Sequence, residues 1–257
     1  MSKIVERTLD FIELFAEQSR PLSLSDISRM LNVPMSSCHD VLQSLQARGY
    51  VTEVAPRAGY YPTMRLHALA ATIARGDPVA TRSERALTAL RDALDETVAM
   101  GKQTSPTSGL YLMVLESSNR LRFHNVPGEP IRSIHATSAG KVLLGQLPPD
   151  RFDAWLAQAT LTPMTPTTVT SKSKLREAIA IGRERGWYLN QEESGAGVTA
   201  IGAGFTWLGV LYFITVAGPT QRMLDNLDIS TEELLKACKR LGEGEFGLND
   251  QQFGRAR

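Results

Sequence analysis

The sequence has few cysteines and no excess of charge of either sign. Cys38 and Cys238 are the two cysteines, and they lie far apart in the chain, so no disulfide framework is indicated. The 28 Lys and Arg residues nearly balance the 27 Asp and Glu residues, which gives a formal net charge of +1. This balance excludes a chain that is basic or acidic throughout, so any surface for nucleic acid must be local.

Long hydrophobic runs are also missing. The longest apolar stretch, residues 208–217, is about half of the roughly 20 residues that a membrane-spanning helix needs. The first residues, MSKIVERTLDF, lack the apolar core of a signal peptide. We therefore expect a cytoplasmic protein, and a chain of 257 residues that is 42% hydrophobic allows one large or two ordinary globular domains.

The stretch ATSAGK at residues 136–141 contains only part of a phosphate-binding loop. A P-loop has two glycines that bracket four residues, followed by Lys and then Ser or Thr. Here Gly140 is the single glycine, and Val142 follows Lys141. The stretch instead predicts the start of a helix, whose free backbone N–H groups either hold a small anion or carboxylate or are simply capped.

The first 63 residues predict a winged helix-turn-helix. Apolar residues at helical spacing indicate a first helix that ends before Arg20, and Ser23 and Asp26 form a capping box that opens a second helix. A third helix begins around Met35. Two short strands then flank a turn at residues 55–58.

The third helix has a polar outer face. Its inward positions are Cys38, Leu42 and Leu45, because these residues recur at helical spacing. The residues that we expect on the outside are Ser36, Ser37, His39, Asp40 and Gln43.

The rest of the chain predicts a connecting helix over residues 64–77 and an α+β domain over residues 78–257. The candidate strands are residues 111–115, 121–126, 187–191, 198–205 and 210–216. The candidate helices are residues 139–147, 150–159, 172–185 and 230–241. This order of elements predicts a mainly antiparallel sheet with helices packed on it.

Three segments together resemble the isocitrate lyase regulator (IclR) family of bacterial transcription factors. They are LSLSDISRMLNVPMSSCHDVLQSLQARGYV, HATSAGKVLLGQL, and EESGAGVTAIGAGF followed by VLYFITVAGP. The resemblance covers nearly the whole chain. It implies a homodimer or tetramer that binds operator DNA through the winged helix, most often as a repressor. It also implies a GAF-like C-terminal domain that binds a small organic effector, with no cofactor or metal.

The candidate reading helix departs from the family pattern. Where the family commonly has Lys-Ser-Thr and then an Arg, this chain has Met35-Ser36-Ser37 and Asp40. Residues 1–65 carry seven basic and seven acidic residues, so we expect a shallower salt dependence of DNA binding than for a basic domain. The expected DNA contacts are Ser36, Ser37, His39, Asp40 and Gln43, with Arg57 on the wing. In the alternative reading, His39 and Asp40 are solvated helix residues.

The effector contacts that the resemblance implies fall on small residues. They are Ser138, Ala139, Asn190, Ala200, Thr215 and Ala217, with Met100, Tyr111, Leu112 and Met113 as apolar neighbours. Relatives often have a cysteine at the place of Ala200, a proline at that of Gly204 and an acidic residue at that of Asn190. The nearly neutral wall favours an aromatic or otherwise uncharged effector, or a small carboxylate or carbonyl compound. The alternative for Thr215 and Ala217 is ordinary strand packing.

An enzyme is the main rival interpretation, and we predict that the protein is not one. Glu192 and Glu193 are adjacent, and neighbours on a strand point to opposite faces, so they do not form an acid/base pair without a bend. Cys38 and His39 diverge by about 100° on one helix. The four histidines lack metal-ligand spacing. A non-catalytic dimeric module that binds small molecules and only weakly binds DNA is the third interpretation.

Overall fold

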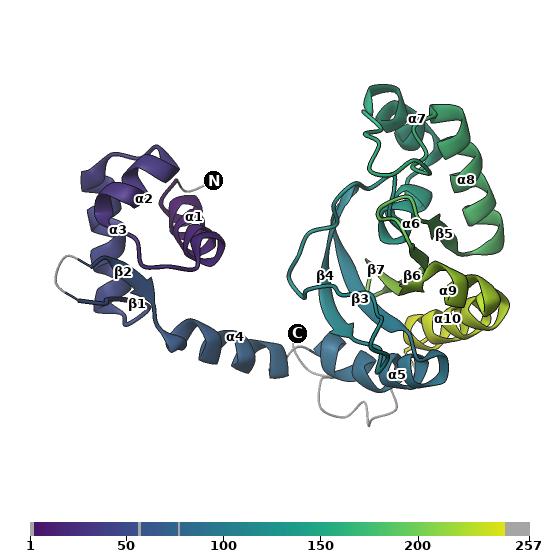
Figure 1. Ribbon diagram of the computed structural model, residues 1–257, viewed down its shortest axis with the longest axis horizontal. Coiled ribbons are helices and arrows are strands. Elements are labelled where there is room, and N and C mark those ends of the chain that lie inside the picture. Colours follow the sequence, from purple (N-terminus) through teal and green to yellow (C-terminus); the bar gives the residue numbers. More distant parts are fainter. Residues whose placement is uncertain (1–2, 56–57, 77, 245–257) are drawn as a thin grey trace. The chain divides into compact units, whose positions relative to one another are not determined.

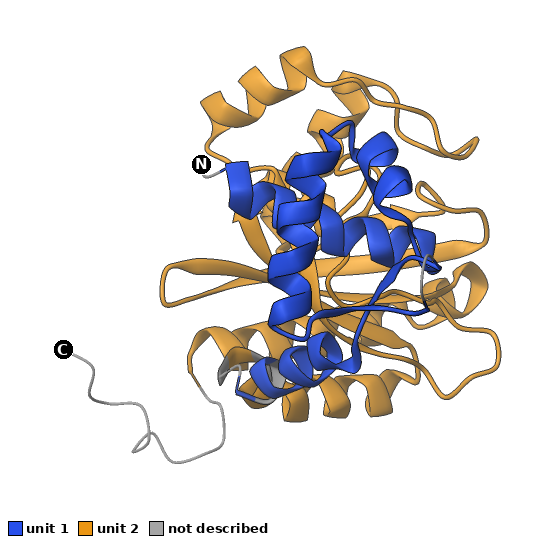
Figure 2. Ribbon diagram, turned by 90° about the vertical axis from the view of Figure 1, so that its left-hand side faces the viewer, with its two compact units in different colours: residues 1–77 blue, residues 78–257 orange. Residues whose placement is uncertain are grey.

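The computed structural model describes residues 3–55, 58–76 and 78–244, and the chain divides into two compact units, residues 1–77 and 78–257 (Figure 2). The first unit follows the predicted order of three helices and a hairpin, with a further helix at its end. Its elements are α1 (Lys3–Gln18), α2 (Leu24–Leu31), α3 (Met35–Ala47), β1 (Val51–Glu53), β2 (Tyr60–Pro62) and α4 (Met64–Gly76).

Local capping explains the bend between α2 and α3. The predicted capping box is confirmed: the Ser23 side chain accepts from the Asp26 N–H, and the Asp26 carboxylate accepts from the Ser23 N–H. Asn32 ends α2 in the left-handed region with φ of 53°, a conformation that Asn tolerates better than most residues. The three helices then bury one apolar core, which includes Phe11, Phe15, Ile27, Cys38 and Leu42.

The wing is anchored to the segment that precedes α2. Strands β1 and β2 pair antiparallel, and Leu22 and Tyr60 exchange backbone hydrogen bonds of 3.0 and 2.8 Å. Gly59 makes this approach feasible, because a Cβ atom there would lie 2.8 Å from the Leu22 carbonyl carbon. Arg57, the expected wing contact, lies outside the described residues.

The second unit is a five-stranded antiparallel sheet with helices on both faces (Figure 1). Its strand order is β4-β3-β7-β6-β5. The strands are β3 (Thr97–Ser105), β4 (Ser108–Leu115), β5 (Tyr188–Gln191), β6 (Val198–Trp207) and β7 (Val210–Pro219). The helices are α5 (Pro78–Leu94), α6 (Ser138–Gln146), α7 (Pro149–Gln158), α8 (Lys172–Arg185), α9 (Thr220–Asp225) and α10 (Leu227–Gly242). The predicted α+β class is confirmed.

Each face of the sheet carries its own apolar core. One core lies between the sheet and α5, α9 and α10, and it contains Leu87, Met223 and Leu234 from these helices. The other lies between the sheet and α6, α7 and α8. Because strand residues alternate between faces, this division decides which side chains can meet at a common site.

One expectation about strands was wrong, and one strand was missed. Residues 121–126 form no strand. Side chains hold this segment instead: the Thr97 hydroxyl donates to the Phe123 carbonyl at 2.7 Å, and Arg122 pairs with Glu116. The structure also contains β3, which we did not predict as a strand. Its second half is polar and partly exposed, so the strand lacks a continuous apolar pattern.

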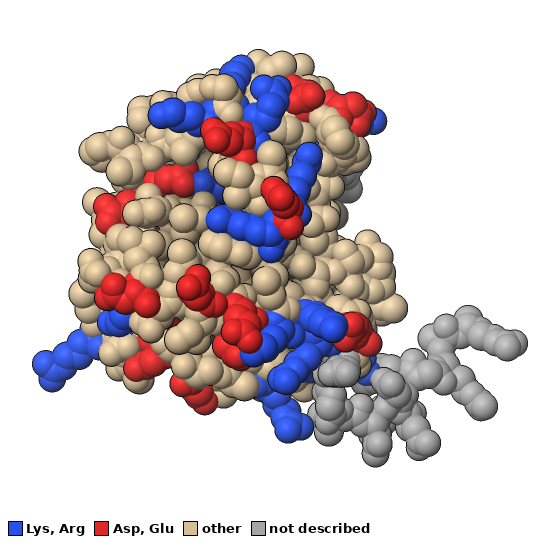
Figure 3. All heavy atoms as spheres, turned by 90° about the vertical axis from the view of Figure 1, so that its right-hand side faces the viewer, with Lys and Arg blue, Asp and Glu red and all other residues tan. Residues whose placement is uncertain are grey.

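The surface shows mixed charge. On the face drawn in Figure 3, Lys and Arg side chains alternate with Asp and Glu, in keeping with the small net charge. None of the described helices is both long enough and apolar enough to cross a membrane.

Candidate functional site

Helix α3 presents two different polar faces. Ser36, His39 and Gln43 are exposed and recur at helical spacing, so they share one face. Ser37 is half-buried and lies about a quarter turn around the helix from Ser36. The five residues expected on the outside therefore do not form a single surface.

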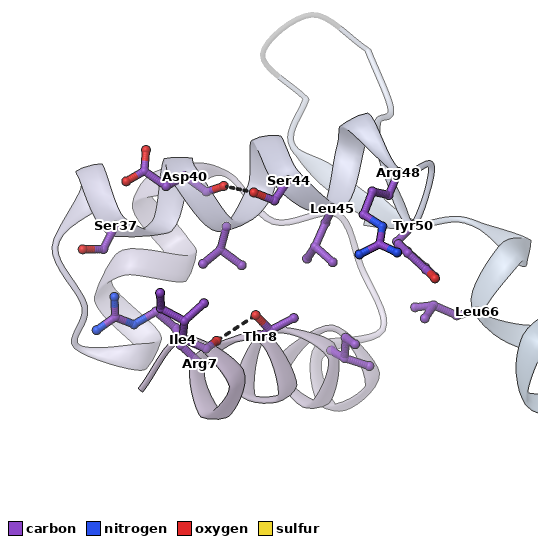
Figure 4. A pocket seen from close by; sticks show the side chains of 12 residues that line it. Ile4, Arg7, Thr8, Ser37, Asp40, Ser44, Leu45, Arg48, Tyr50 and Leu66 are labelled. Atoms are coloured by element: carbon purple, nitrogen blue, oxygen red, sulfur yellow. Dashed lines mark hydrogen bonds between the residues drawn. The ribbon is translucent and has the colours of Figure 1, made fainter. Parts of the chain in front are cut away.

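Ser37 and Asp40 border a cleft between α1 and α3 (Figure 4). The cleft has a volume of about 610 Å³ and is lined from α1 by Ile4, Arg7 and Thr8. In Figure 4 the Asp40 carboxylate points away from α1, and the Ser44 hydroxyl donates to the Asp40 carbonyl at 2.9 Å. Asp40 thus lies at the edge between the cleft and the exposed face, whereas Ser37 belongs to the cleft.

Two arginines that the sequence reasoning passed over lie at the base of the hairpin. Arg48 and Arg65 both contact the ring of Tyr50, with guanidinium carbons 5.9 and 5.2 Å from its centroid. Both are exposed, and they follow α3 and begin α4 respectively. This pair places two positive charges next to α3, which itself contains no Lys or Arg. In the sequence, Arg48 and Tyr50 come directly before the two strands of the hairpin and Arg65 comes shortly after them, and this placement could have identified the two arginines.

In the second unit, the start of α6 rests directly on β6. A Cβ atom on Gly202 would lie 3.1 Å from the Ser138 carbonyl carbon, and one on Gly204 would lie 2.9 Å from Val142. The first residue of α6 therefore lies over residue 202 of β6, and the next turn of the helix lies over residue 204. The N-terminal end of α6 is directed at Ala200, the next residue of the strand on the same face.

A row of small and polar residues crosses the sheet at this end of α6. Strand register places Asn190 opposite Ala200, Ala200 opposite Ala217, and Ala217 opposite Thr97. Thr215 lies in the adjacent row, opposite Gly202. The structure therefore brings together on one face all six residues that the resemblance pointed to, and all six are buried: Ser138, Ala139, Asn190, Ala200, Thr215 and Ala217.

The polar groups of this row differ in what they can offer a ligand. Thr137 caps α6, and its hydroxyl accepts from the Gly140 N–H at 3.1 Å. The N–H groups of Ser138 and Ala139, the first in the helix, have no intrahelical acceptor by the geometry of a helix start. Asn190 is already engaged, since its Oδ1 accepts from the Glu193 N–H at 2.8 Å and its Nδ2 donates to Ser194 at 2.7 Å. One N–H of that amide remains for a ligand.

The expected apolar neighbours fall on both faces. Tyr111 lies on the α6 face, packed edge-on against Phe213 with ring centroids 5.6 Å apart. Burial raises the pKa of its hydroxyl, and a hydrogen bond from Asn125 opposes this shift in part. Met100, Leu112 and Met113 pack in the core on the opposite face, so they cannot line a site at the start of α6. The sequence did not reveal this for β4 because a bulge, with Leu112 unpaired between Tyr111 and Met113, turns these two residues to opposite faces.

A buried ion pair next to this row was also missed. Lys141 and Glu193 are both buried, and the Lys141 ammonium donates to the Glu193 carboxylate and, at 2.7 Å, to the Leu189 carbonyl. Desolvation lowers the pKa of Lys141, and the Glu193 charge opposes that shift. Lys141 therefore holds the turn after β5 in place rather than a nucleotide phosphate.

The other side chains considered for chemistry are dispersed. Cys38 and Cys238 are buried in the cores of different units, and burial raises the pKa of Cys238 to about 12. Among residues 3–55, 58–76 and 78–244, no three His, Cys, Asp or Glu side chains are grouped as a metal site would require.

Comparison with known proteins decides the family. The family model for the C-terminal domain of the bacterial transcriptional regulator IclR matches residues 71–241, and the model for the IclR helix-turn-helix domain matches residues 4–55. The chain belongs to the IclR family. It is a transcriptional regulator with a helix-turn-helix DNA-binding domain and a C-terminal domain, and relatives in this family are named as regulators rather than as enzymes.

Several IclR-type relatives align over most of their length. The regulator XynR of Escherichia coli is 29% identical over 197 residues, 77% of each chain, and BhcR of Paracoccus denitrificans is 29% identical over 247 residues, 94% of this chain and 87% of its own. The repressor AllR of Escherichia coli is 24% identical over 249 residues, which are 96% of this chain and 91% of its own. A solved IclR homologue from Microbacterium hydrocarbonoxydans, complexed with 4-hydroxybenzoate, has a TM-score of 0.77 at 21% identity and covers 94% of this chain and 98% of its own.

Proposed function

We propose that this protein is a repressor whose binding to operator DNA is modulated by a small organic effector at the start of α6. The observation that carries the proposal is the row of buried small residues toward which the N-terminal end of α6 is directed. A helix start offers free N–H groups and partial positive charge to a carboxylate or carbonyl oxygen. The relative AllR is named as a repressor, which supports that sign of regulation.

The residues of this site favour an aromatic or small carboxylate effector. Ala200 and Ala217 have small side chains, while Ser138 and Thr215 provide hydroxyl groups. Phe213 lies two residues from Thr215 on the same face of β7, and Tyr111 of β4 packs against it, so both rings provide aromatic surface. The IclR homologue complexed with 4-hydroxybenzoate is an example of a family member with a ligand of this class.

The proposed DNA contacts are the exposed face of α3 and the arginines at the hairpin base. Ser36, His39 and Gln43 would read bases, Asp40 would lie at the edge of that face, and Arg48 and Arg65 would contact phosphates. Ser37, which borders the cleft, and Arg57, which the sequence assigns to the wing, stay in the proposed set. Because one short helix reads few base pairs, we propose that the regulator works as a homodimer or tetramer in the cytoplasm.

A gel-shift experiment on the protein's own upstream DNA tests the proposal. We expect retarded complexes with that DNA and none with a random fragment of equal length, and release when a benzoate or small carboxylate from a panel is added. 4-Hydroxybenzoate is the first probe. Tight binding of the panel compounds without any specific complex would instead favour a small-molecule-binding module that does not regulate through DNA.

The Gln43→Ala variant tests base reading by α3. Gln43 is exposed on the same face as Ser36 and His39, and a glutamine amide can contact an adenine edge through two hydrogen bonds. We expect the preference for operator over random DNA to fall by about 1–3 kcal/mol. Competition titration of the two DNAs measures this, with Ser44→Ala, on the side of α3 that lines the cleft, as the control. Equal discrimination by the Gln43→Ala and wild-type proteins would remove Gln43 from the reading set.

The Met35→Lys variant tests whether the start of α3 approaches the DNA backbone. Met35 is exposed at the first position of the helix, where relatives commonly have lysine. A new cation there should strengthen binding to operator and random DNA alike, and it should steepen the salt dependence by about one unit of log–log slope. Titration at several salt concentrations measures the slope. An unchanged slope would place position 35 away from phosphate.

A further inference from the structure

A second cavity lies beside the buried ion pair. It has a volume of about 570 Å³, in the range of small-molecule sites, and it is formed by α6, α8, β5 and the segments next to them (Figure 1). Lys141 and Glu193 form part of its wall. None of the residues proposed to contact the effector lines this cavity.

Glu193 leaves one buried oxygen atom without a partner. Its Oε1 accepts from Lys141, but its Oε2 is buried and has no hydrogen-bond partner in the described part of the chain. An unpaired buried carboxylate oxygen is costly, so such an atom indicates a missing donor. The Lys141 ammonium uses two of its three donors, on Glu193 and on the Leu189 carbonyl, so a further N–H is also unused there.

Arg185 brings a second cation to the same cavity. Its guanidinium carbon stacks over the Trp187 ring 3.4 Å from the centroid, and its Nε donates to the Trp187 carbonyl at 2.8 Å. Within the described residues, the two terminal nitrogens have no acceptor, which leaves them for an anion. Arg185 is also close enough to Lys141 that its charge contributes to lowering the pKa of that ammonium group.

The remaining wall completes a pattern of paired charges and apolar surface. Glu192 is a second carboxylate in the lining, so the cavity faces two cations and two anions. Val169, Ala178 and Ile181 supply an aliphatic wall. A simple anion would meet the carboxylates, and a simple cation would meet Lys141 and Arg185. A ligand that carries both charges and an apolar side chain satisfies all three kinds of surface.

We propose that this cavity is an accessory binding site for a small aliphatic α-amino acid. Its ammonium group donates to Glu193 Oε2, its carboxylate accepts from the Arg185 guanidinium, and its side chain packs on the aliphatic wall. The site is connected to the start of α6, because Lys141 follows Ser138 by three residues and the Glu193 N–H donates to Asn190. An amino acid bound here would therefore contact the same helix and the same turn as the effector.

Isothermal titration of the full chain with L-leucine tests the proposal. We expect saturable binding at millimolar concentrations or below. 4-Methylpentanoate lacks the ammonium group and isopentylamine lacks the carboxylate, so each should bind about tenfold more weakly or worse, because each loses one charge-assisted hydrogen bond. Equal binding of the three compounds, or no binding of L-leucine, would overturn the proposal.

Two matched arginine variants locate the site on α8. Arg185→Gln removes the proposed carboxylate contact and should weaken L-leucine binding about tenfold or more. Arg176→Gln removes an arginine from the same helix that pairs with exposed Asp153 outside this cavity, and it should bind L-leucine as the wild-type protein does. Glu193→Gln, which keeps the shape of the side chain, should also weaken binding. If Arg185→Gln and Glu193→Gln both retain full affinity, L-leucine binds elsewhere and the proposal fails.

An effector-site variant keeps the two proposals separable. Ala200→Phe is directed at the row below α6 and leaves Lys141, Arg185 and Glu193 unchanged, so it should bind L-leucine with unchanged affinity. Loss of L-leucine binding in Ala200→Phe together with full binding in Arg185→Gln would place the amino acid in the effector site. That result would overturn the accessory site without bearing on operator binding.

Discussion

Replacing Lys141 by methionine should lower the free energy of unfolding of the second unit by about 3–5 kcal/mol. Lys141 is 2% exposed, and its charge is balanced by the buried carboxylate of Glu193. Methionine fills a similar volume but leaves that carboxylate without its cation and the Leu189 carbonyl without a donor. All three tryptophans, Trp155, Trp187 and Trp207, lie in residues 78–257, so urea unfolding followed by tryptophan fluorescence reports on this unit.

A double variant separates the contribution of the ion pair to stability from the contribution of side-chain packing. Lys141→Met combined with Glu193→Leu removes both charges, and we expect it to recover most of the lost stability, because no buried charge is then left unpaired. The control is Arg176→Met, which breaks an ion pair whose side chains are both more than half exposed and should cost less than about 1 kcal/mol. A Lys141→Met variant as stable as the wild-type protein would show that the ion pair contributes little to the fold.

The first unit could be predicted closely from the sequence because its signals are local. Helical spacing, the capping box at Ser23 and the break at Pro34 each depend on residues within one turn of one another, and the structure places α1, α2 and α3 accordingly. The partial burial of Ser37 in the cleft was not predicted. It depends on where α1 lies beside α3, and helical spacing along α3 alone does not contain that information.

In the second unit, local sequence patterns predicted the helices and most strands, but they did not predict on which face of the sheet each strand residue lies. The resemblance indicated residues 138, 190, 200 and 215. The register of β5, β6 and β7 brings the last three to one face, and the packing of α6 on β6 brings residue 138 to the same face. Met100 was misplaced because β3 was not predicted as a strand, and Met113 was misplaced because a bulge in β4 turns it to the face opposite Tyr111.

The buried pair of Lys141 and Glu193 was out of reach for a related reason. The two residues are 52 positions apart, and the sequence alone indicates a solvated lysine on a short helix. Their contact follows from the packing of α6 against β5 and from the turn that Asn190 holds after that strand. Long-range contacts between charged residues leave no periodic pattern, so a structure is needed to find them.

Replacing Ala200 by phenylalanine should abolish the response to the effector and leave operator binding intact. Ala200 is 7% exposed and lies between Asn190 and Ala217 in the row toward which the N-terminal end of α6 is directed. A phenyl ring there would occupy the space that the proposed effector needs. The DNA-binding unit, residues 1–77, is a separate compact unit and is unchanged by the substitution. Gel shifts with and without the effector compound found in the panel measure both properties.

Because enlarging a buried residue costs about 1–3 kcal/mol, a second variant keeps this test independent of folding. Thr215→Val removes a hydroxyl at constant volume from the row next to Ala200. We expect about a tenfold increase in the effector concentration needed to release DNA, the effect of one lost hydrogen bond. A ligand can shift only an equilibrium whose two states it contacts differently, so loss of these contacts must weaken the response if the effector binds here. If both variants release DNA at the wild-type effector concentration, the effector binds elsewhere and the start of α6 is an ordinary capped helix.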